Sequence, residues 1–163
     1  MKIKKVQVNN SKKCLEVATT KAKWALPFAK LRLIPTPENR IKTIYVDKEL
    51  GNEGITYTLE SGEEDSVPLD AFLDYNREPE YMRKALLHNL TCFALEYIEK
   101  SGLSKREIAR KMSTSPAQLY RLLNTANYAK TIDQMAKLLY CLGYDLELKT
   151  RPSSHDRLTH SHP

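Results

Sequence analysis

Residues 104–124, SKREIARKMSTSPAQLYRLLN, decide the fold of the C-terminal half because they predict two short helices joined by a tight turn. Ser104 is a favourable N-cap for the first helix, and Glu107 three residues later completes a capping box. Ser115 can cap the second helix, and Pro116 suits its first position. Apolar residues recur at helical spacing in both segments: Ile108, Ala109 and Met112 in the first, and Leu119, Leu122 and Leu123 in the second.

Two short helices joined by three small polar residues form the unit that places its second helix in the major groove of DNA. Residues 101–130 are also basic, with Glu107 as their single acid. The basic side chains are Lys105, Arg106, Arg110, Lys111, Arg121 and Lys130. Because cations neutralise phosphates, the pattern and the charge together predict binding to double-stranded DNA.

Residues 103–148 resemble the helix-turn-helix domain of the Cro and phage-repressor (XRE) class, which includes many antitoxins of toxin–antitoxin operons. The matching features are Ala109 inside the first helix, Leu119 and Leu122 in the second, and the later segment TIDQMAKLLYCLGYDLEL. The turn departs from the class, with Ser113 in place of the usual glycine and Thr114 in place of an aliphatic residue. We expect Ser113 to adopt a left-handed backbone conformation. The resemblance implies a lambda-repressor-like domain and a role in transcriptional regulation.

Nine residues of this region are predicted to contact DNA: Lys105, Arg106, Thr114, Ser115, Ala117, Gln118, Arg121, Asn127 and Lys130. Gln118 suits adenine, and Arg121 suits guanine or a nearby phosphate. Ser115 and Lys105 lie at two predicted helix N-termini, where backbone N–H groups can also hold phosphates. The resemblance adds the loop 124–130, NTANYAK, whose counterpart approaches the phosphate backbone. In that loop Tyr128 either joins Asn127 and Lys130 at the phosphates or packs on the domain.

Helices are also predicted on both sides of this pair. The first covers about residues 80–100, with Leu86, Leu90, Phe93 and Tyr97 on one apolar stripe that we assign to the core, and Leu87, Ala94 and Ile98 beside it. The second begins after the capping residue Thr131 and ends at Gly143. Residues 144–148, YDLEL, then alternate strictly and predict a β-strand, which would pair with its twin across a dimer axis or join the N-terminal sheet.

The first 75 residues predict a small antiparallel β-rich domain. Alternation of apolar and polar residues indicates strands over 2–8, parts of 31–34, and 42–46, and ITYTL at 55–59 is rich in strand-forming residues. Residues 67–69 begin a short strand or a bend, and prolines place edges or loops at 24–39. The charge divides sharply, because residues 1–48 carry twelve Lys or Arg against three acids, whereas 49–80 carry ten acids against Arg77. The acidic segment is either solvated or paired with basic residues of the same domain, or it faces a basic partner protein.

The fold class is therefore α+β, with a β-rich domain at 1–75, an all-α helix-turn-helix domain with a C-terminal strand at 79–150, and a disordered tail at 151–163. No apolar run approaches the length of a membrane span, and the N-terminus lacks the apolar region of a signal peptide. We expect a cytoplasmic protein without membrane contact. Three widely spaced cysteines predict neither a disulfide framework nor a zinc site.

The sequence contains no P-loop or other catalytic motif, and His88, the one histidine outside the tail, falls in a predicted amphipathic helix. We expect no enzyme activity, no cofactor and no metal. The leading hypothesis is a homodimeric, sequence-specific DNA-binding regulator of transcription, and the resemblance implies that it acts on a neighbouring operon. The alternative is an antitoxin-like interaction protein whose N-terminal domain neutralises a toxin or other partner protein and whose helix-turn-helix autoregulates its operon. A third possibility is that the N-terminal domain senses a small ligand.

Overall fold

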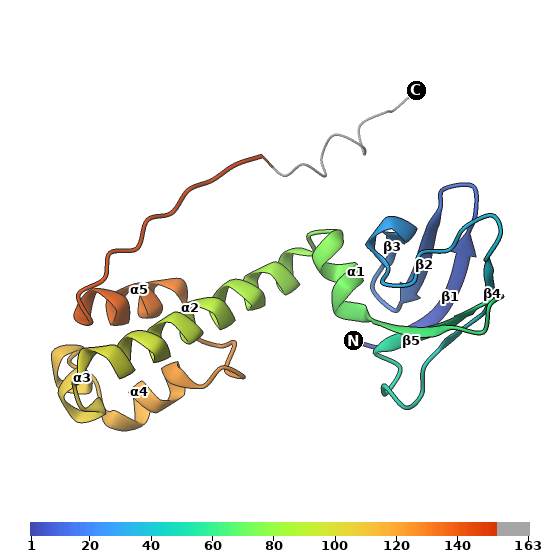
Figure 1. Ribbon diagram of the computed structural model, residues 1–163. Helices are drawn as coiled ribbons and strands as arrows, with labels where there is room; N and C mark the ends of the chain where they lie inside the picture. Colours follow the sequence, from blue (N-terminus) through green and yellow to red (C-terminus); the bar gives the residue numbers. More distant parts are fainter. Residues whose placement is uncertain (153–163) are drawn as a thin grey trace. The chain divides into compact units, whose positions relative to one another are not determined.

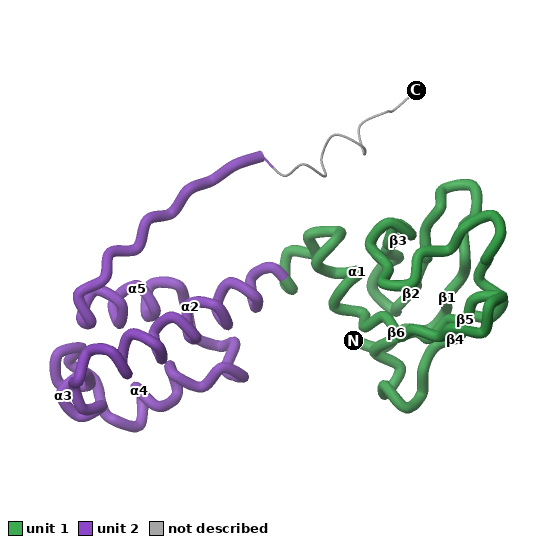
Figure 2. Tube along the Cα trace, in the orientation of Figure 1, with its two compact units in different colours: residues 1–81 green, residues 82–163 purple. Residues whose placement is uncertain are grey.

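The structure, a computed structural model, describes residues 1–152 of the 163-residue chain. It is a mixed α+β protein in which two three-stranded antiparallel sheets precede the α-helices (Figure 1). The chain divides into two compact units, with the boundary between Tyr81 and Met82 (Figure 2). We call them unit 1 and unit 2. The tail predicted to be disordered lies outside the described residues from 153 onwards.

Unit 1 contains all six strands found in residues 1–152. The first sheet has the order β1-β2-β3, and the second has the order β4-β5-β6. Their bounds are Ile3–Asn9 for β1, Cys14–Thr19 for β2, Lys23–Pro27 for β3, Ile41–Val46 for β4, Gly54–Leu59 for β5 and Glu64–Pro68 for β6. Pro27 ends an edge strand, where a proline interrupts no inner ladder. The predicted antiparallel β-rich domain thus contains two sheets, and residues 31–34 form no strand, since Pro35 and Pro37 follow directly.

Two aromatic side chains in the core of unit 1 are fully buried. Tyr57 on β5 donates a hydrogen bond from its hydroxyl to the Leu33 carbonyl oxygen, at 2.7 Å. Phe72 belongs to α1, Leu69–Tyr75, a helix that the sequence analysis did not predict. The helix has only two turns, and an apolar pattern this short does not distinguish a helix from the short strand or bend expected at 67–69. A 3-10 turn, η1, covers Phe28–Lys30.

Unit 2 is built from helices whose predicted type and position are confirmed. They are α2, Pro79–Ser101, which starts in the last residues of unit 1, α3, Lys105–Lys111, α4, Pro116–Leu123, and α5, Ile132–Cys141. The predicted apolar stripe of α2 is only partly correct, because Leu86 and Phe93 are 40% and 49% exposed. The core takes Leu90 from that stripe together with the three residues predicted beside it: Leu87, Ala94 and Ile98.

The predicted strand at 144–148 is not a strand in the described chain. Gly143 ends α5 with φ +86°, as expected for a C-terminal cap. The Tyr144 ring then stacks on Tyr97 of α2, with 3.7 Å between centroids. An alternating sequence forms a strand only where its backbone pairs with a neighbouring strand, and residues 144–148 pair with none in the described chain. Within residues 1–152, no helix is both long and apolar enough to cross a bilayer.

Candidate nucleic-acid interface

The start of α3 is fixed by the predicted capping box. The Glu107 backbone nitrogen donates to Ser104 Oγ at 3.3 Å, and the Ser104 backbone nitrogen donates to Glu107 Oε2 at 2.8 Å. The Ser104 hydroxyl also donates to that carboxylate and is the main reason that the pKa of Glu107 is lowered. Glu107, the single acid among residues 101–130, is therefore engaged in holding the helix end.

The turn between α3 and α4 is a Schellman motif. Ser113 has φ +54°, which confirms the left-handed conformation predicted for it. Its backbone nitrogen donates to the Arg110 carbonyl oxygen at 3.0 Å, and the Thr114 nitrogen donates to the Ala109 oxygen at 2.9 Å. These two bonds satisfy the last carbonyls of α3 without a glycine and fix the path of the chain into α4.

Helix α4 is capped by Ser115, whose hydroxyl accepts a hydrogen bond from the Gln118 backbone nitrogen at 3.2 Å. One face is buried and consists of Leu119, Leu122 and Leu123. The opposite face carries the exposed residues Ala117, Gln118 and Arg121. The sequence therefore identified the orientation of this helix in its domain correctly.

Tyr120 is a member of the exposed face that the sequence analysis missed. Its ring is 56% exposed, and the Lys105 ammonium lies over it, 5.0 Å from the centroid. This cation–π contact brings the first residue of α3 against the outer face of α4. The helical positions 117, 120, 121 and 124 fall on one stripe, which is the signal that would have revealed Tyr120.

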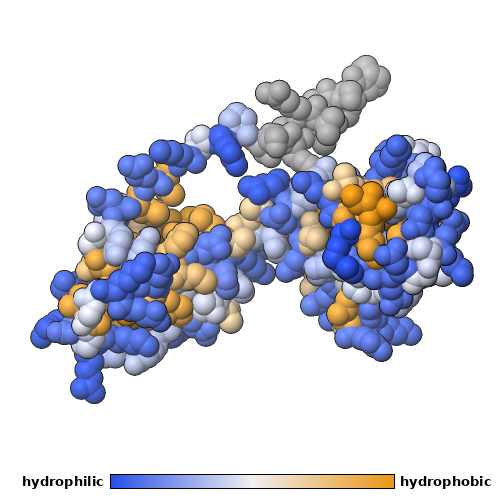
Figure 3. Space-filling view, viewed as in Figure 1, coloured by the Kyte–Doolittle hydropathy of each residue, from blue (hydrophilic) through white to orange (hydrophobic). Residues whose placement is uncertain are grey.

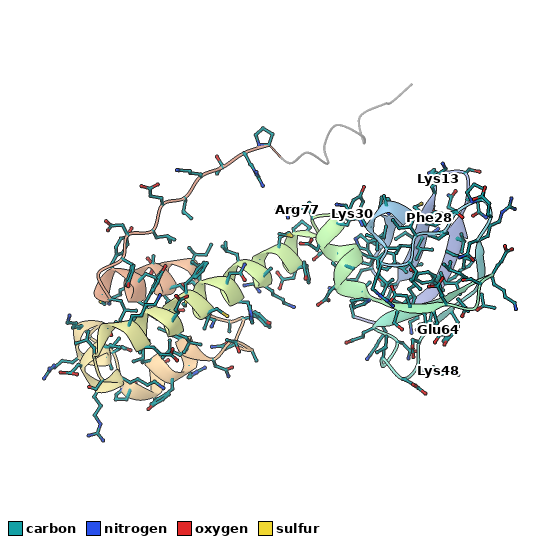
Figure 4. The ribbon with its side chains drawn as sticks, in the orientation of Figure 1. Lys13, Phe28, Lys30, Lys48, Glu64 and Arg77 are labelled. Atoms are coloured by element: carbon teal, nitrogen blue, oxygen red, sulfur yellow. The ribbon has the colours of Figure 1, made fainter. Side chains whose placement is uncertain are left out.

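The surface of α3 and α4 is basic. Five exposed cations surround the pair: Lys105, Arg106, Arg110, Lys111 and Arg121. Figure 4 shows long nitrogen-tipped side chains extending outward from the end of unit 2 that contains α3, and Figure 3 shows hydrophilic residues at the same end. We call these five cations, together with Ala117, Gln118 and Tyr120, the α3–α4 face.

Asn127 has a structural position in the loop after α4. Its side-chain amide donates to the Arg121 carbonyl oxygen at 2.9 Å, and its Oδ1 accepts from the Ala129 nitrogen at 3.1 Å. Tyr128 packs on the domain, with its carbonyl oxygen accepting from Arg83 and its ring 5.7 Å from the Lys84 ammonium. Both the nitrogen and the oxygen of the Asn127 side chain therefore make hydrogen bonds that order the loop.

Lys130 was predicted to contact phosphate, and the structure corrects this. The side chain is 3% exposed, and its Nζ donates to Thr91 Oγ1 at 2.6 Å, to the Leu122 oxygen at 2.7 Å and to the Asn124 oxygen at 2.8 Å. All three ammonium protons are therefore used inside the domain, and burial lowers the pKa of Lys130. Lys130 holds the C-terminal end of α4 against α2 instead of reaching outward.

Thr114 is half-buried in the turn, and Ser115 is exposed beside it. Six of the nine residues predicted to contact DNA are therefore exposed on or next to α3 and α4: Lys105, Arg106, Ser115, Ala117, Gln118 and Arg121. In residues 1–152, no three His, Cys, Asp or Glu side chains are grouped as metal ligands would be. Comparisons with protein-family models, with curated proteins and with solved structures find no match. Function is therefore inferred from the geometry of the α3–α4 face.

Proposed function

We propose that unit 2 binds double-stranded DNA through the α3–α4 face and that the protein is a sequence-specific transcriptional regulator. The observation that carries this proposal is the outer face of α4, where Gln118 and Arg121 are exposed, on a pair of helices that carries five exposed cations. A capped α-helix with one buried face and one polar face has the width and the shape of an element that enters the major groove. The resemblance of residues 103–148 to the Cro and phage-repressor class agrees with this proposal.

The residues of the face divide into two chemical roles. Gln118 and Arg121 carry planar groups that can make paired hydrogen bonds to adenine and to guanine, so we assign them to base readout. Arg106, Arg110 and Lys111 lie on α3 and are assigned to phosphates, which fix the register of the protein but not its sequence preference. Lys105 is held over Tyr120, and we assign it to a phosphate beside α4.

We further propose that the DNA-bound form is a two-fold dimer. One α4 helix covers only a few base pairs, which limits its specificity, and two-fold symmetry doubles the site. Two features of unit 2 support this step. The side chains of Leu86 and Phe93 are exposed on α2, and the segment 144–148 has an alternating pattern without a ladder partner.

Salt dependence of duplex binding tests the proposal. Fluorescence anisotropy with a labelled random duplex of about 30 bp should give an affinity that falls steeply between about 50 and 200 mM salt, because phosphate contacts release counterions. About four phosphate contacts per protomer correspond to a log–log slope of about −4 per protomer. Arg106→Gln should reduce this slope by about one.

Lys137→Gln is the matched control, since Lys137 is an exposed cation of α5, which Figure 1 draws on the opposite side of α2 from α4. It should leave the slope unchanged. A slope near zero for the unmodified protein, or equal losses for Arg106→Gln and Lys137→Gln, would contradict the assignment of the α3–α4 face to DNA.

A further inference from the structure

Unit 1 contains a half-open groove of about 340 Å³ between the β1–β2 turn and the loop that leads into β4. Its volume lies at the lower end of the range for small-molecule sites, and it equals that of about eleven liquid water molecules. The proposed contact with DNA involves only unit 2 and makes no use of this groove.

The groove has an apolar wall. Phe28, Pro35, Pro37 and Ile41 line it, and Phe28 is buried while the other three are partly or fully exposed. The hydrogen bond from the Phe28 backbone nitrogen to the Lys13 carbonyl oxygen, at 2.8 Å, joins this wall to the β1–β2 turn. Figure 4 accordingly labels Lys13 and Phe28 in neighbouring positions of unit 1.

The rim of the groove carries two cations, Lys13 and Arg40, and no Asp or Glu belongs to the lining. Arg40 donates from Nε to the Pro37 carbonyl oxygen at 3.1 Å, which fixes the guanidinium against the loop. Its two terminal nitrogens, like the Lys13 ammonium, form no ion pair with any described residue. The Glu60 carboxylate contacts Arg40 only at the backbone nitrogen, at 3.5 Å. The groove therefore combines an apolar wall with positive charge that the domain itself leaves unneutralised.

The backbone at Lys13 is an independent observation. Its φ is +50°, in the left-handed region where glycine or asparagine would sit with less strain. A lysine held at such a position has a cost for folding, and here it closes the β1–β2 turn, where its backbone nitrogen donates to the Asn10 carbonyl oxygen at 3.4 Å. Here the strained position also belongs to a cationic residue that lines the groove.

We propose that this groove binds a small organic carboxylate, with the carboxylate between Lys13 and Arg40 and an apolar body against Phe28, Pro35 and Ile41. Arginine binds a planar carboxylate with two parallel hydrogen bonds, and the ammonium adds a charge-assisted one. The volume accommodates a ligand of about ten non-hydrogen atoms. The inference does not depend on DNA binding by unit 2.

The test is a titration of the isotope-labelled full chain followed by NMR, with benzoate as the probe. We expect saturable shifts at the backbone amides of Thr36 and Ile41, which line the groove. Benzamide has the same shape without the charge, and inorganic phosphate has the charge without the apolar body, so both should bind at least about tenfold more weakly. Phenyl phosphate distinguishes a carboxylate site from a general anion site, and equal or tighter binding of it would overturn the carboxylate assignment.

Three variants separate binding from folding. Lys13→Gly removes the ammonium and relieves the strained backbone, so benzoate affinity should fall about tenfold or more while the melting temperature stays equal or rises. Lys12→Gln is the matched control, since it removes a charge from the same turn outside the lining. Arg40→Gln should weaken benzoate to a similar extent. The proposal is overturned if benzoate shows no saturable binding, if benzamide binds equally well, or if Lys13→Gly and Lys12→Gln have the same effect.

Discussion

The buried ammonium of Lys130 gives the most demanding prediction about unit 2. Lys130→Met keeps an unbranched side chain of similar length but removes Nζ and its three hydrogen bonds. The Thr91 hydroxyl still donates to the Leu87 carbonyl oxygen at 2.6 Å, so it loses an acceptor contact but stays bonded. The Leu122 and Asn124 carbonyl oxygens at the end of α4 lose a charged donor, and a buried polar group left unsatisfied costs about 1–3 kcal/mol.

Relief from burying a charge partly offsets this loss, so we expect Lys130→Met to lower the free energy of unfolding of unit 2 by about 2–4 kcal/mol. A domain of ordinary stability, about 5–15 kcal/mol, would remain folded at room temperature. The slope of DNA binding against salt should stay unchanged, because no phosphate contact is removed.

The chain offers an internal control for this measurement. Its single tryptophan, Trp24, lies on β3 in unit 1, whereas most of the helical residues lie in unit 2. Urea denaturation followed by far-ultraviolet circular dichroism should therefore show the loss, while the Trp24 fluorescence transition stays in place. Lys137→Met, at an exposed position, should change stability by no more than about 0.5 kcal/mol. A stability loss below about 1 kcal/mol together with a salt slope reduced by one would refute the buried position of Lys130.

Three further predictions concern other parts of the molecule. Burial, with the nearby Asp65 charge as a smaller cause, raises the pKa of Tyr57 to about 12, so the folded state keeps this proton at a pH where the unfolded chain loses it. Unit 1 should therefore lose up to about 2.7 kcal/mol of stability between about pH 10 and pH 12, as measured by urea denaturation followed by Trp24 fluorescence. Tyr57→Phe should abolish this pH-dependent loss. Ser113→Gly should raise the stability of unit 2 by about 0.5–1 kcal/mol because φ is +54°, and a lowered melting temperature would contradict the assigned turn. Phe93→Glu should convert a dimer to a monomer in light scattering, and a protein that is already monomeric on DNA would exclude the proposed symmetry.

The helices of unit 2 could be predicted because the signals that start and end them are local. Ser104 with Glu107, and Thr131 with Gln134, form both halves of a capping box within four residues of sequence. The left-handed turn at Ser113 also follows from neighbours alone, since its hydrogen bonds reach no further than Ala109. No tertiary contact is needed to place these ends.

The burial of Lys130 could not be predicted, because one of its three acceptors belongs to α2, far from it in the sequence, while the other two are local carbonyl oxygens at the end of α4. Thr91 lies 39 residues before it, and the sequence shows the charge of a lysine but not its burial. The buried row of α2 was likewise ambiguous, since Leu86 and Leu87 both belong to apolar rows and only packing selects Leu87. In unit 1, alternation marked several strands but could not show that they divide into two sheets, because pairing depends on contacts between strands.

Base preference in α4 is the property that most directly distinguishes a sequence-reading helix from a merely basic surface. Selection of bound duplexes from a random library, followed by sequencing, should yield a preferred site with the unmodified protein. Gln118→Ala should then flatten the preference at one or two base pairs, a loss of about 1–3 kcal/mol of discrimination, while binding to non-specific duplex stays nearly intact. Arg121→Ala should flatten a neighbouring position, and Lys137→Ala should change no position. If the selected sites show no preference, or if Gln118→Ala and Lys137→Ala give the same sites as the unmodified protein, α4 does not read DNA sequence.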